Sequence, residues 1–385
     1  MNKERISRKS VLLASEPNVD GVFRHIEQLA ALLIKHDIKV HYAYSSRRRS
    51  DRLESLTDSI KEAGGKTIDL NISNGPSWRD LTAFLRLVFF YFRTKPDVVH
   101  GHASKAGFLI RLIPGARRIY TPHAYYGMGL RGGIKEVLFN FLERIMAPFA
   151  ATVCLSTDEE HFARKVVRIR EATIIYNCVN FDVFRPAITN EEKESILNSL
   201  GADRHSWIIG SVGRISYQKN PALLYHAFRK LCVSKPEETF TLLHVGAGDD
   251  ILSSQLCRLA YTFPDNGKLL PIRKQITTEQ CYRIMDVFCL TSRYEGMPYT
   301  VLEAMASNLP LVLTDVPGLC FFNHYPNGLN RIYFGTSEND DSIFAALGEW
   351  FDNRYQPPNH RKIAMGSFSE EIFFQKHSDL YFKNG

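Results

Sequence analysis

Short apolar runs alternate with amphipathic stretches along most of this 385-residue chain. Apolar runs of a few residues end at polar or turn-forming positions, as at 11–15, 38–43 and 286–290, and such runs predict strands. Between the runs, apolar positions recur at i, i+3, i+4 and i+7, as over residues 26–33, and this spacing predicts helices. The order of strand, loop, helix and strand is typical of doubly wound α/β domains.

The alternation fills two halves of the chain. An irregular segment over residues 177–186 separates them, and the pattern restarts with a strand expected at 207–213. Further strands are expected at 151–155, 173–176, 240–248, 269–272 and 310–314. Two Rossmann-like domains that face each other across a ligand cleft are the economical architecture, with boundaries expected at 1–186 and 187–366.

Composition and charge narrow the class of protein. The chain is 44% hydrophobic and 23% charged, as in ordinary soluble proteins. Its seven cysteines are scattered without a C-x-x-C pair, which favours reduced thiols and no zinc site. The N-terminal MNKERISRKS lacks an apolar signal region, and no apolar run is long enough for a membrane span. We therefore expect a cytoplasmic protein.

The net charge of +7 is unevenly distributed. Residues 1–185 contain 29 Lys+Arg and 19 Asp+Glu, a net charge of +10. Residues 186–385 contain the other 48−29 = 19 Lys+Arg and 41−19 = 22 Asp+Glu, a net charge of −3. A basic first half indicates an anionic partner, although a basic solvated surface gives the same pattern. The apolar helix expected over 79–95, flanked by arginines, fits either a membrane interface or a crossover helix packed on the sheet, and the helix over 134–142 has the same ambiguity.

Residues 291–318 carry two carboxylates, Glu295 and Glu303, between two expected strands. The loop before the expected helix lies at the carboxyl end of a strand, where open α/β sheets bind ligands. Pro298 fits the first turn of that helix, because its missing N–H costs nothing there. Amides near the helix start would face an anion. The stretch therefore predicts a ligand site.

A second loop of the same half carries cations. Gly213 ends a strand, Arg214 and Lys219 follow, and Pro221 begins a helix. A guanidinium, an ammonium and a helix N-terminus together suit a diphosphate. Two solvated surface cations are the alternative interpretation.

In the first half, the loop over 16–21 follows the first strand and contains one glycine, Gly21, beside Asp20. A dinucleotide fingerprint is thus absent, and a dehydrogenase is unexpected. Histidines follow two later strands, in HGHASKAG at 100–107 and YTPHAYYG at 120–127. His123 is the candidate catalytic residue, because Pro122 fixes the entry to its loop. A structural role is the alternative, and metal ligation is less favoured because no D-x-D and no nearby carboxylate partners accompany these histidines.

Four stretches together resemble the family-four glycosyltransferases, which have the two-domain GT-B fold. They are GSVGRISYQKNP at 210–221, HVGAGDD at 244–250, DVFCLTSRYEGMPYTVLEAMA at 286–306 and LVLTDVPG at 311–318. The E-x7-E spacing of Glu295 and Glu303 is the family signature, and the G-R-x5-K spacing accompanies it. The N-terminal pieces VDGVFRHIEQLA, PDVVHGH and YTPHA match more loosely.

The resemblance implies a retaining hexosyltransferase that needs no metal or other cofactor and uses a nucleotide-diphosphate sugar, with a UDP-sugar favoured. Arg214 and Lys219, next to Gly213, would hold the donor diphosphate. Glu295 would contact the sugar hydroxyls, and Glu303 the ribose hydroxyls. His123 would approach the transferred sugar. The remaining implied contacts are Gly296, Met297 and Pro298 at the sugar and phosphate, Ile272 and Arg273 at the nucleobase, and Asp20 and Gly21 on the acceptor side.

The resemblance further implies a glycan or lipid-linked acceptor in the synthesis of capsule, exopolysaccharide or lipopolysaccharide, with no role for nucleic acid. A closing segment over 367–385 would cross back to the first domain, which would bind the acceptor at the cytoplasmic face of the inner membrane. Three features depart from the family pattern: Asn308 replaces a glycine, 318–334 is unusually aromatic, and Ala-Tyr-Tyr follows His123 where glycine or aspartate is common. Another nucleotide-sugar enzyme of the same fold, such as an epimerase or a phosphorylase, and a noncatalytic partner subunit are the alternatives.

Overall fold

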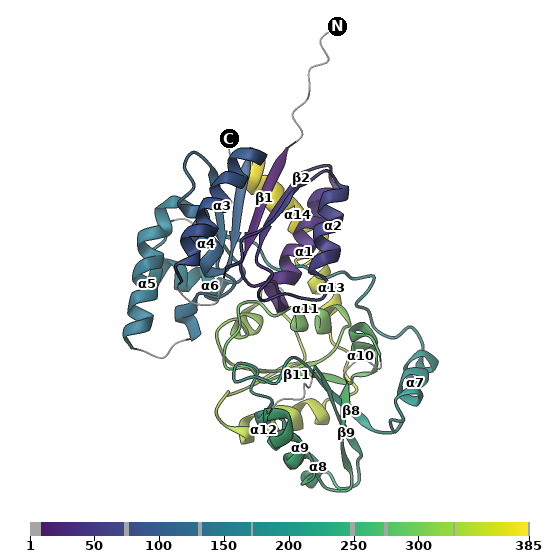
Figure 1. Cartoon of the computed structure of the whole chain (residues 1–385). Helices are drawn as coiled ribbons and strands as arrows, with labels where there is room; N and C mark the ends of the chain where they lie inside the picture. Colours follow the sequence, from purple (N-terminus) through teal and green to yellow (C-terminus); the bar gives the residue numbers. More distant parts are fainter. Residues whose placement is uncertain are drawn as a thin grey trace. The chain divides into compact units, whose positions relative to one another are not determined.

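The computed structural model describes residues 9–72, 77–129, 133–170, 172–246, 251–272, 276–325 and 328–383. The chain divides into two compact units (Figure 1). Unit 1 contains Met1–Asn177 and Glu371–Gly385, and unit 2 contains Cys178–Glu370. Unit 1 is thus built from both ends of the chain.

Unit 1 has a seven-stranded sheet in the order β3-β2-β1-β4-β5-β6-β7, and every pairing is parallel. Its strands are β1 (Ser10–Ser15), β2 (Lys39–Tyr44), β3 (Thr67–Asp69), β4 (Val98–His102), β5 (Arg117–Thr121), β6 (Ala151–Cys154) and β7 (Ala172–Ile174). Its α-helices are α1 (Asp20–Lys35), α2 (Leu53–Glu62), α3 (Arg79–Thr94), α4 (Ala103–Arg111), α5 (Ile134–Met146), α6 (Thr157–Phe162) and α14 (Glu370–Phe382). The strand order reverses between β1 and β4, which is the usual ligand position in such sheets.

Helices cover both faces of this sheet, which explains why β1 and β4 are buried along their whole length. Helices α3 and α4 pack on one face through a core that includes Leu12, Val99 and Ile110. On the other face, Tyr381 of α14 contacts His100 of β4, and α14 stacks Phe374 on His36. The alternation of side chains along β4 therefore separates an aliphatic face from a face of histidines.

Unit 2 has a six-stranded parallel sheet in the order β10-β9-β8-β11-β12-β13. Its strands are β8 (Trp207–Val212), β9 (Phe240–Val245), β10 (Gly267–Ile272), β11 (Val287–Leu290), β12 (Leu311–Thr314) and β13 (Ile332–Gly335). Its α-helices are α7 (Asn190–Ser199), α8 (Pro221–Ser234), α9 (Ile251–Ala260), α10 (Thr278–Ile284), α11 (Tyr299–Ala306), α12 (Asp340–Asp352) and α13 (His360–Met365). Here the order reverses between β8 and β11.

Three details of unit 2 bear on the sequence-based expectations. The aromatic stretch 318–334 contains a 3-10 helix, Cys320–His324, and most of β13 rather than a plain loop. Pro298 is the N-cap of α11, one residue before the first turn in which it was expected. Asn308 has a φ of +54° just after α11, a left-handed conformation that asparagine tolerates in place of glycine.

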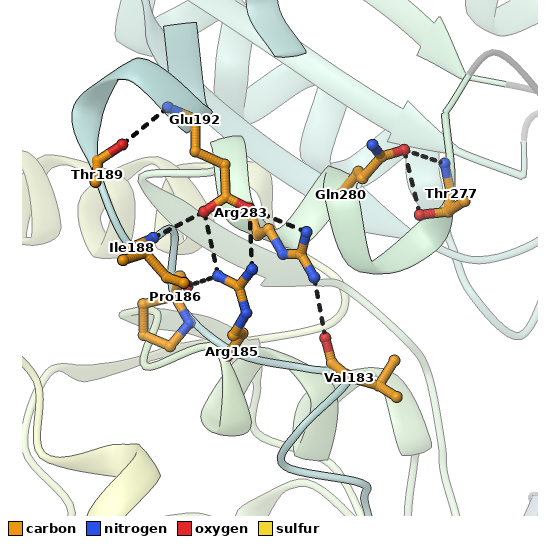
Figure 2. A network of polar contacts seen from close by, with 9 residues as sticks. All are labelled: Val183, Arg185, Pro186, Ile188, Thr189, Glu192, Thr277, Gln280 and Arg283. Carbon is orange, nitrogen blue, oxygen red and sulfur yellow. Dashed lines mark hydrogen bonds and ion pairs between the residues drawn. The ribbon is translucent and has the colours of Figure 1, made fainter. Parts of the chain in front are cut away.

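The segment that enters unit 2 is held by one carboxylate, Glu192 of α7 (Figure 2). The two terminal guanidinium nitrogens of Arg185, Nη1 and Nη2, each donate to Glu192 at 3.1 Å, and Nη1 of Arg283 on α10 donates to it at 3.1 Å. The side-chain hydrogen bond from Arg185 lowers the pKa of Glu192 to about 2. A single charged side chain therefore fastens the start of unit 2 to α10.

Among the described residues, the structure contains no helix that is both long and apolar enough to cross a bilayer.

Candidate functional site

The two predicted loops of unit 2 meet at the carboxyl ends of β8 and β11. The Lys219 ammonium lies 2.7 Å from a carboxylate oxygen of Glu295, 76 positions later in the chain. Glu295 is only 6% exposed, and the side chain of Lys219 is 21% exposed. The pair is therefore held in a largely buried position that keeps one face of the lysine open to a ligand.

Neutral donors complete the environment of Glu295. The Ser292 hydroxyl donates to the carboxylate oxygen that Lys219 contacts, at 2.6 Å. The Gln218 amide donates to the other oxygen at 3.5 Å and to the carbonyl of Tyr294 at 3.1 Å. The loops are thus joined by a network in which Glu295 accepts and Lys219, Gln218 and Ser292 donate.

Backbone contacts fix the loop that carries Glu295. Its N–H donates to the carbonyl of Pro317 at 3.0 Å, after β12. Gly318 has a φ of +82°, and a Cβ atom built there would lie 2.2 Å from the carbonyl oxygen of Glu295. Only glycine allows this approach, and the VPG sequence at 316–318 thereby positions Glu295.

Gly213 and Arg214 lie where the second motif was predicted. Gly213 donates its N–H to the carbonyl of Val245, and a Cβ atom at Gly246 would come 2.9 Å from the carbonyl oxygen of Gly213. Arg214 is exposed beside this turn. Asn220 adopts a φ of +47° at the N-cap of α8, so that Pro221 begins the helix. The turn therefore presents a guanidinium near the start of a 14-residue helix.

Glu303 lies on α11 and is 1% exposed. The hydroxyl of Tyr282 on α10 donates to Glu303 at 2.7 Å and to the carbonyl of Thr300 at 3.1 Å. Met297 and Pro298 are buried at the start of α11, and Gly296 is half-buried. Tyr282 fixes one oxygen of Glu303, a partner that sequence reasoning missed because it comes from a different helix.

Of the two predicted nucleobase contacts, Ile272 lies within the described residues. Ile272 is the last residue of β10, 1% exposed, and its carbonyl accepts the N–H of Gly246 at 3.2 Å. Arg273, the other predicted base contact, lies outside the described residues.

The predicted acceptor-side residues of unit 1 lie at the start of α1. Asp20 and Gly21 are both exposed, and Asp20 has a φ of +53°. The preceding turn is anchored by Asn18, whose amide donates to the carbonyl of Ser45 at 2.6 Å and which accepts the hydroxyl of Ser15 at 2.6 Å. This turn therefore presents a carboxylate and a glycine at the reversal point of the sheet.

His123 follows β5 in a left-handed conformation, with a φ of +59°, and Ala124 has a φ of +73°. The buried carboxylate of Glu159 accepts the N–H of Ala124 at 2.7 Å and of Leu155 at 2.6 Å, so it braces this turn. Burial raises the pKa of Glu159 to about 7. The strained turn sets the direction of His123, as expected of a loop built for a function.

Unit 1 contains a cluster of five histidines that includes His123, which the sequence did not predict. They are His25, His100, His102, His123 and His377. Burial lowers the pKa of each, to about 4 for His25 and well below the usual value for His123. The imidazoles are therefore neutral at physiological pH. The sequence shows His100 and His102 close together on β4, but His25 and His377 come from α1 and α14, far away in the chain.

Two family models match consecutive parts of the chain. The model described as "Glycosyltransferase Family 4" matches residues 19–183, and "Glycosyl transferases group 1" matches residues 192–364. The chain belongs to the family-four glycosyltransferases. The site of unit 2, with its paired loops, lies within the second match.

Known proteins similar to this glycosyltransferase agree with the family. An Escherichia coli UDP-Gal:alpha-D-GlcNAc-diphosphoundecaprenol alpha-1,3-galactosyltransferase is 27% identical over 275 residues, 68% of each chain. The capsular polysaccharide biosynthesis glycosyltransferase CapM of Staphylococcus aureus is 24% identical over 78% of this chain and 80% of its own. The crystal structure of Anabaena HepE in complex with UDP has a TM-score of 0.75 at 15% identity, covering 97% and 99% of the two chains. The fold is therefore GT-B, as predicted.

Proposed function

We propose that this glycosyltransferase moves a hexose or N-acetylhexosamine from a UDP-sugar to a glycan or lipid-linked acceptor in bacterial polysaccharide synthesis, with retention and without a metal. The observation that carries the proposal is the contact of Lys219 with Glu295, which joins the G-R-x5-K loop to the E-x7-E loop. The UDP-sugar named for the E. coli relative and the UDP bound to HepE support the nucleotide. The names of the E. coli relative and CapM support the acceptor class.

The proposed chemistry is a displacement at the anomeric carbon. The bond between that carbon and the diphosphate oxygen breaks, and its electron pair stays on the departing UDP. Arg214 and Lys219 stabilise this charge, since cations already in place need no reorganisation during the reaction. The acceptor hydroxyl attacks from the face that the diphosphate leaves, and its proton passes to the departing diphosphate oxygen.

The recognition roles fall on the carboxylates. Glu295 accepts hydrogen bonds from hydroxyls of the sugar, and its contacts with Lys219 and Ser292 orient it. Glu303 accepts hydrogen bonds from the ribose hydroxyls beside its contact with Tyr282, because a carboxylate can accept several hydrogen bonds. His123 accepts a hydrogen bond from the transferred sugar, a role that fits a neutral imidazole.

A screen of nucleotide sugars for protection against thermal unfolding tests the donor assignment. A donor held at 100 times its Kd adds about 2.7 kcal/mol to the free energy of unfolding. UDP-hexoses and UDP-N-acetylhexosamines should protect, and GDP- and ADP-sugars should not. Equal protection by all nucleotides, or protection by none, would contradict the assignment.

Lys219→Ala tests the catalytic role. Turnover in donor hydrolysis should fall by about 10²-fold or more, because one preorganised cation is lost. Lys230→Ala is the matched control: Lys230 of α8 lies 3.1 Å from Asp340, in an ion pair of the same unit outside the site. Near-normal turnover in Lys219→Ala would remove Lys219 from the mechanism.

We also propose that unit 1 binds an anionic membrane surface through α3 and α5. Helix α3 packs on the sheet through Leu87 and Phe90, so it is a crossover helix. It also exposes a stripe at helical spacing, made of Trp78, Leu81, Leu85, Phe89 and Phe92, with Trp78 76% and Phe89 63% exposed. Helix α5 exposes a second stripe, made of Ile134, Val137, Leu138, Phe141, Leu142 and Ile145. Surfaces of this kind mark interaction sites.

Charge favours a membrane over a protein partner. Arg86 and Arg93 are exposed on α3 beside the stripe, and Arg144 is exposed on α5. Ion pairs of Lys105 with Asp80 (2.8 Å) and of Arg111 with Glu143 (2.9 Å) link α4 to α3 and to α5. Apolar side chains next to arginines suit a bilayer interface with anionic lipids.

Binding to phosphatidylglycerol-containing vesicles tests this surface. Replacing both Arg86 and Arg93 with Glu should weaken vesicle binding and leave hydrolysis of a soluble donor intact. The same charge change at Arg204 and Arg229, exposed residues of unit 2, is the control and should leave binding unchanged. Undiminished binding by the Arg86/Arg93 variant would refute the membrane role of α3.

A further inference from the structure

Three histidines of unit 1 bring ring nitrogens close to one another. His25 of α1, His102 at the end of β4 and His123 after β5 each offer a ring nitrogen, and the three nitrogens lie within 4.8 Å of one another. We propose that they form a site for a divalent transition metal such as Zn²⁺. The site was not expected from the sequence, because the three residues are separated by 77 and 21 positions.

The distances between the rings fit ligands of a single ion. Nδ1 of His102 and Nε2 of His123 are 3.1 Å apart. Two nitrogens bound to one zinc at about 2.1 Å lie about 3.0–3.4 Å apart for angles between roughly 90° and 109°. The ring centres are 5.2 Å (His25–His102), 4.7 Å (His25–His123) and 5.3 Å (His102–His123) apart. If each ring centre is about 3.2 Å from the metal, the same angles place the ring centres about 4.5–5.2 Å apart.

Hydrogen bonding leaves His25 with a nitrogen for the metal. Nδ1 of His25 lies 2.9 Å from Oδ1 of Asn177, and an amide oxygen only accepts, so Nδ1 carries the proton. Nε2 then carries the lone pair, and it is buried without a hydrogen-bond partner in the part of the chain that the structure describes. Metal-binding histidines usually donate their other N–H to an oxygen in this way. Asn177 thus orients His25 in the way that an oxygen acceptor orients a metal-binding histidine.

In His102, Nδ1 is the nitrogen that faces His123, in hydrogen-bond contact with its Nε2 at 3.1 Å, and Nε2 is buried without a hydrogen-bond partner among the described residues. The neighbouring His100 is different. Its Nδ1 contacts the hydroxyl of Tyr381 at 2.6 Å, and its Nε2 contacts the hydroxyl of Thr121 at 2.8 Å. His100 is therefore a satisfied structural histidine, whereas His25 and His102 keep nitrogens that the protein does not use.

Three neutral imidazoles and an open position are the donor set of many zinc sites. A zinc ion here would hold the imidazole of His123, which the proposed function assigns to the transferred sugar. Metal binding and that role of His123 would exclude one another. The site itself does not depend on the proposed function, because it is defined by histidines alone.

Metal binding to the full chain tests the proposal. Protein freed of metal with a chelator should take up one equivalent of Zn²⁺, measured by competition with a chromophoric chelator. His25→Gln and His102→Gln should each weaken binding by about 10²-fold or more, since each removes a ligand. His205→Gln, at an exposed histidine of unit 2, is the control and should bind as the unchanged protein does.

X-ray absorption of the zinc-loaded, unmodified protein provides a test that needs no variant to fold. The spectrum should show about three imidazole nitrogens near 2.0–2.1 Å. Uptake below one equivalent, fewer than two imidazoles, or undiminished binding by folded His25→Gln and His102→Gln would overturn the site. Loss of donor protection in the nucleotide screen would overturn the proposed function and leave these results unchanged.

Discussion

The position of Glu295 depends on a glycine that touches its backbone. Gly318→Ala places a Cβ atom 2.2 Å from the carbonyl oxygen of Glu295 and 2.7 Å from that of Gly296. A carbon–oxygen contact needs about 3.3 Å. The two segments must therefore separate by about 1 Å, and the carboxylate of Glu295 must move relative to Lys219.

The effect on turnover follows from that displacement. A misplacement of about 1 Å in an active site can cost about 10²-fold. Gly318→Ala also carries the cost of a left-handed conformation, since φ is +82°, about 1–2 kcal/mol of stability. We expect turnover in donor hydrolysis to fall by about 10²-fold, together with a modest decrease in Tm.

Gly201→Ala separates the two effects. Gly201 lies in the same unit with a φ of +62°, and a Cβ atom there would have no neighbour within 4 Å among the described residues. This variant should lose a similar amount of stability and keep normal turnover. If the turnover of folded Gly318→Ala is within about threefold of that of Gly201→Ala, the close approach does not position Glu295.

Two further predictions concern polar contacts. Tyr282→Phe removes the hydroxyl that donates to Glu303, so the free energy of unfolding should fall by about 1–3 kcal/mol and the Kd for UDP should rise. An unchanged Kd for UDP, measured by calorimetry, would disprove the link between Tyr282 and nucleotide binding. Arg185→Ala should lower the free energy of unfolding by about 1–2 kcal/mol at neutral pH, after allowance for solvent screening of a partly exposed pair. Because the pKa of Glu192 is lowered to about 2 in the folded protein, this stabilisation is present above its unfolded value of 4.5 and is lost as the pH falls toward 2. Urea unfolding at several pH values should show the deficit shrinking over that interval, and a constant deficit would contradict the assignment.

Much of the fold could be read from the sequence. Apolar runs such as 11–15 and 286–290 identified β1 and β11, because strands buried on both faces of a sheet are apolar throughout. Short or polar elements escaped prediction: β3 is three residues long and half-buried, and α7 has few apolar positions. Their structure comes from the neighbours on which they pack, as the contact of Glu192 with Arg283 shows for α7.

The sequence by itself determined the candidate residues of the donor site. The G-R-x5-K and E-x7-E motifs each follow the carboxyl end of a strand, and parallel strands bring these ends to one edge of the sheet. Only the tertiary structure decided which atoms meet. The contact of Lys219 with Glu295, the glycine beneath Glu295 and the trio of His25, His102 and His123 each join segments far apart in the chain. Local periodicity reports what a residue does within its own helix or strand. Contacts between elements depend on how whole helices and strands pack, and that is fixed only when the core forms.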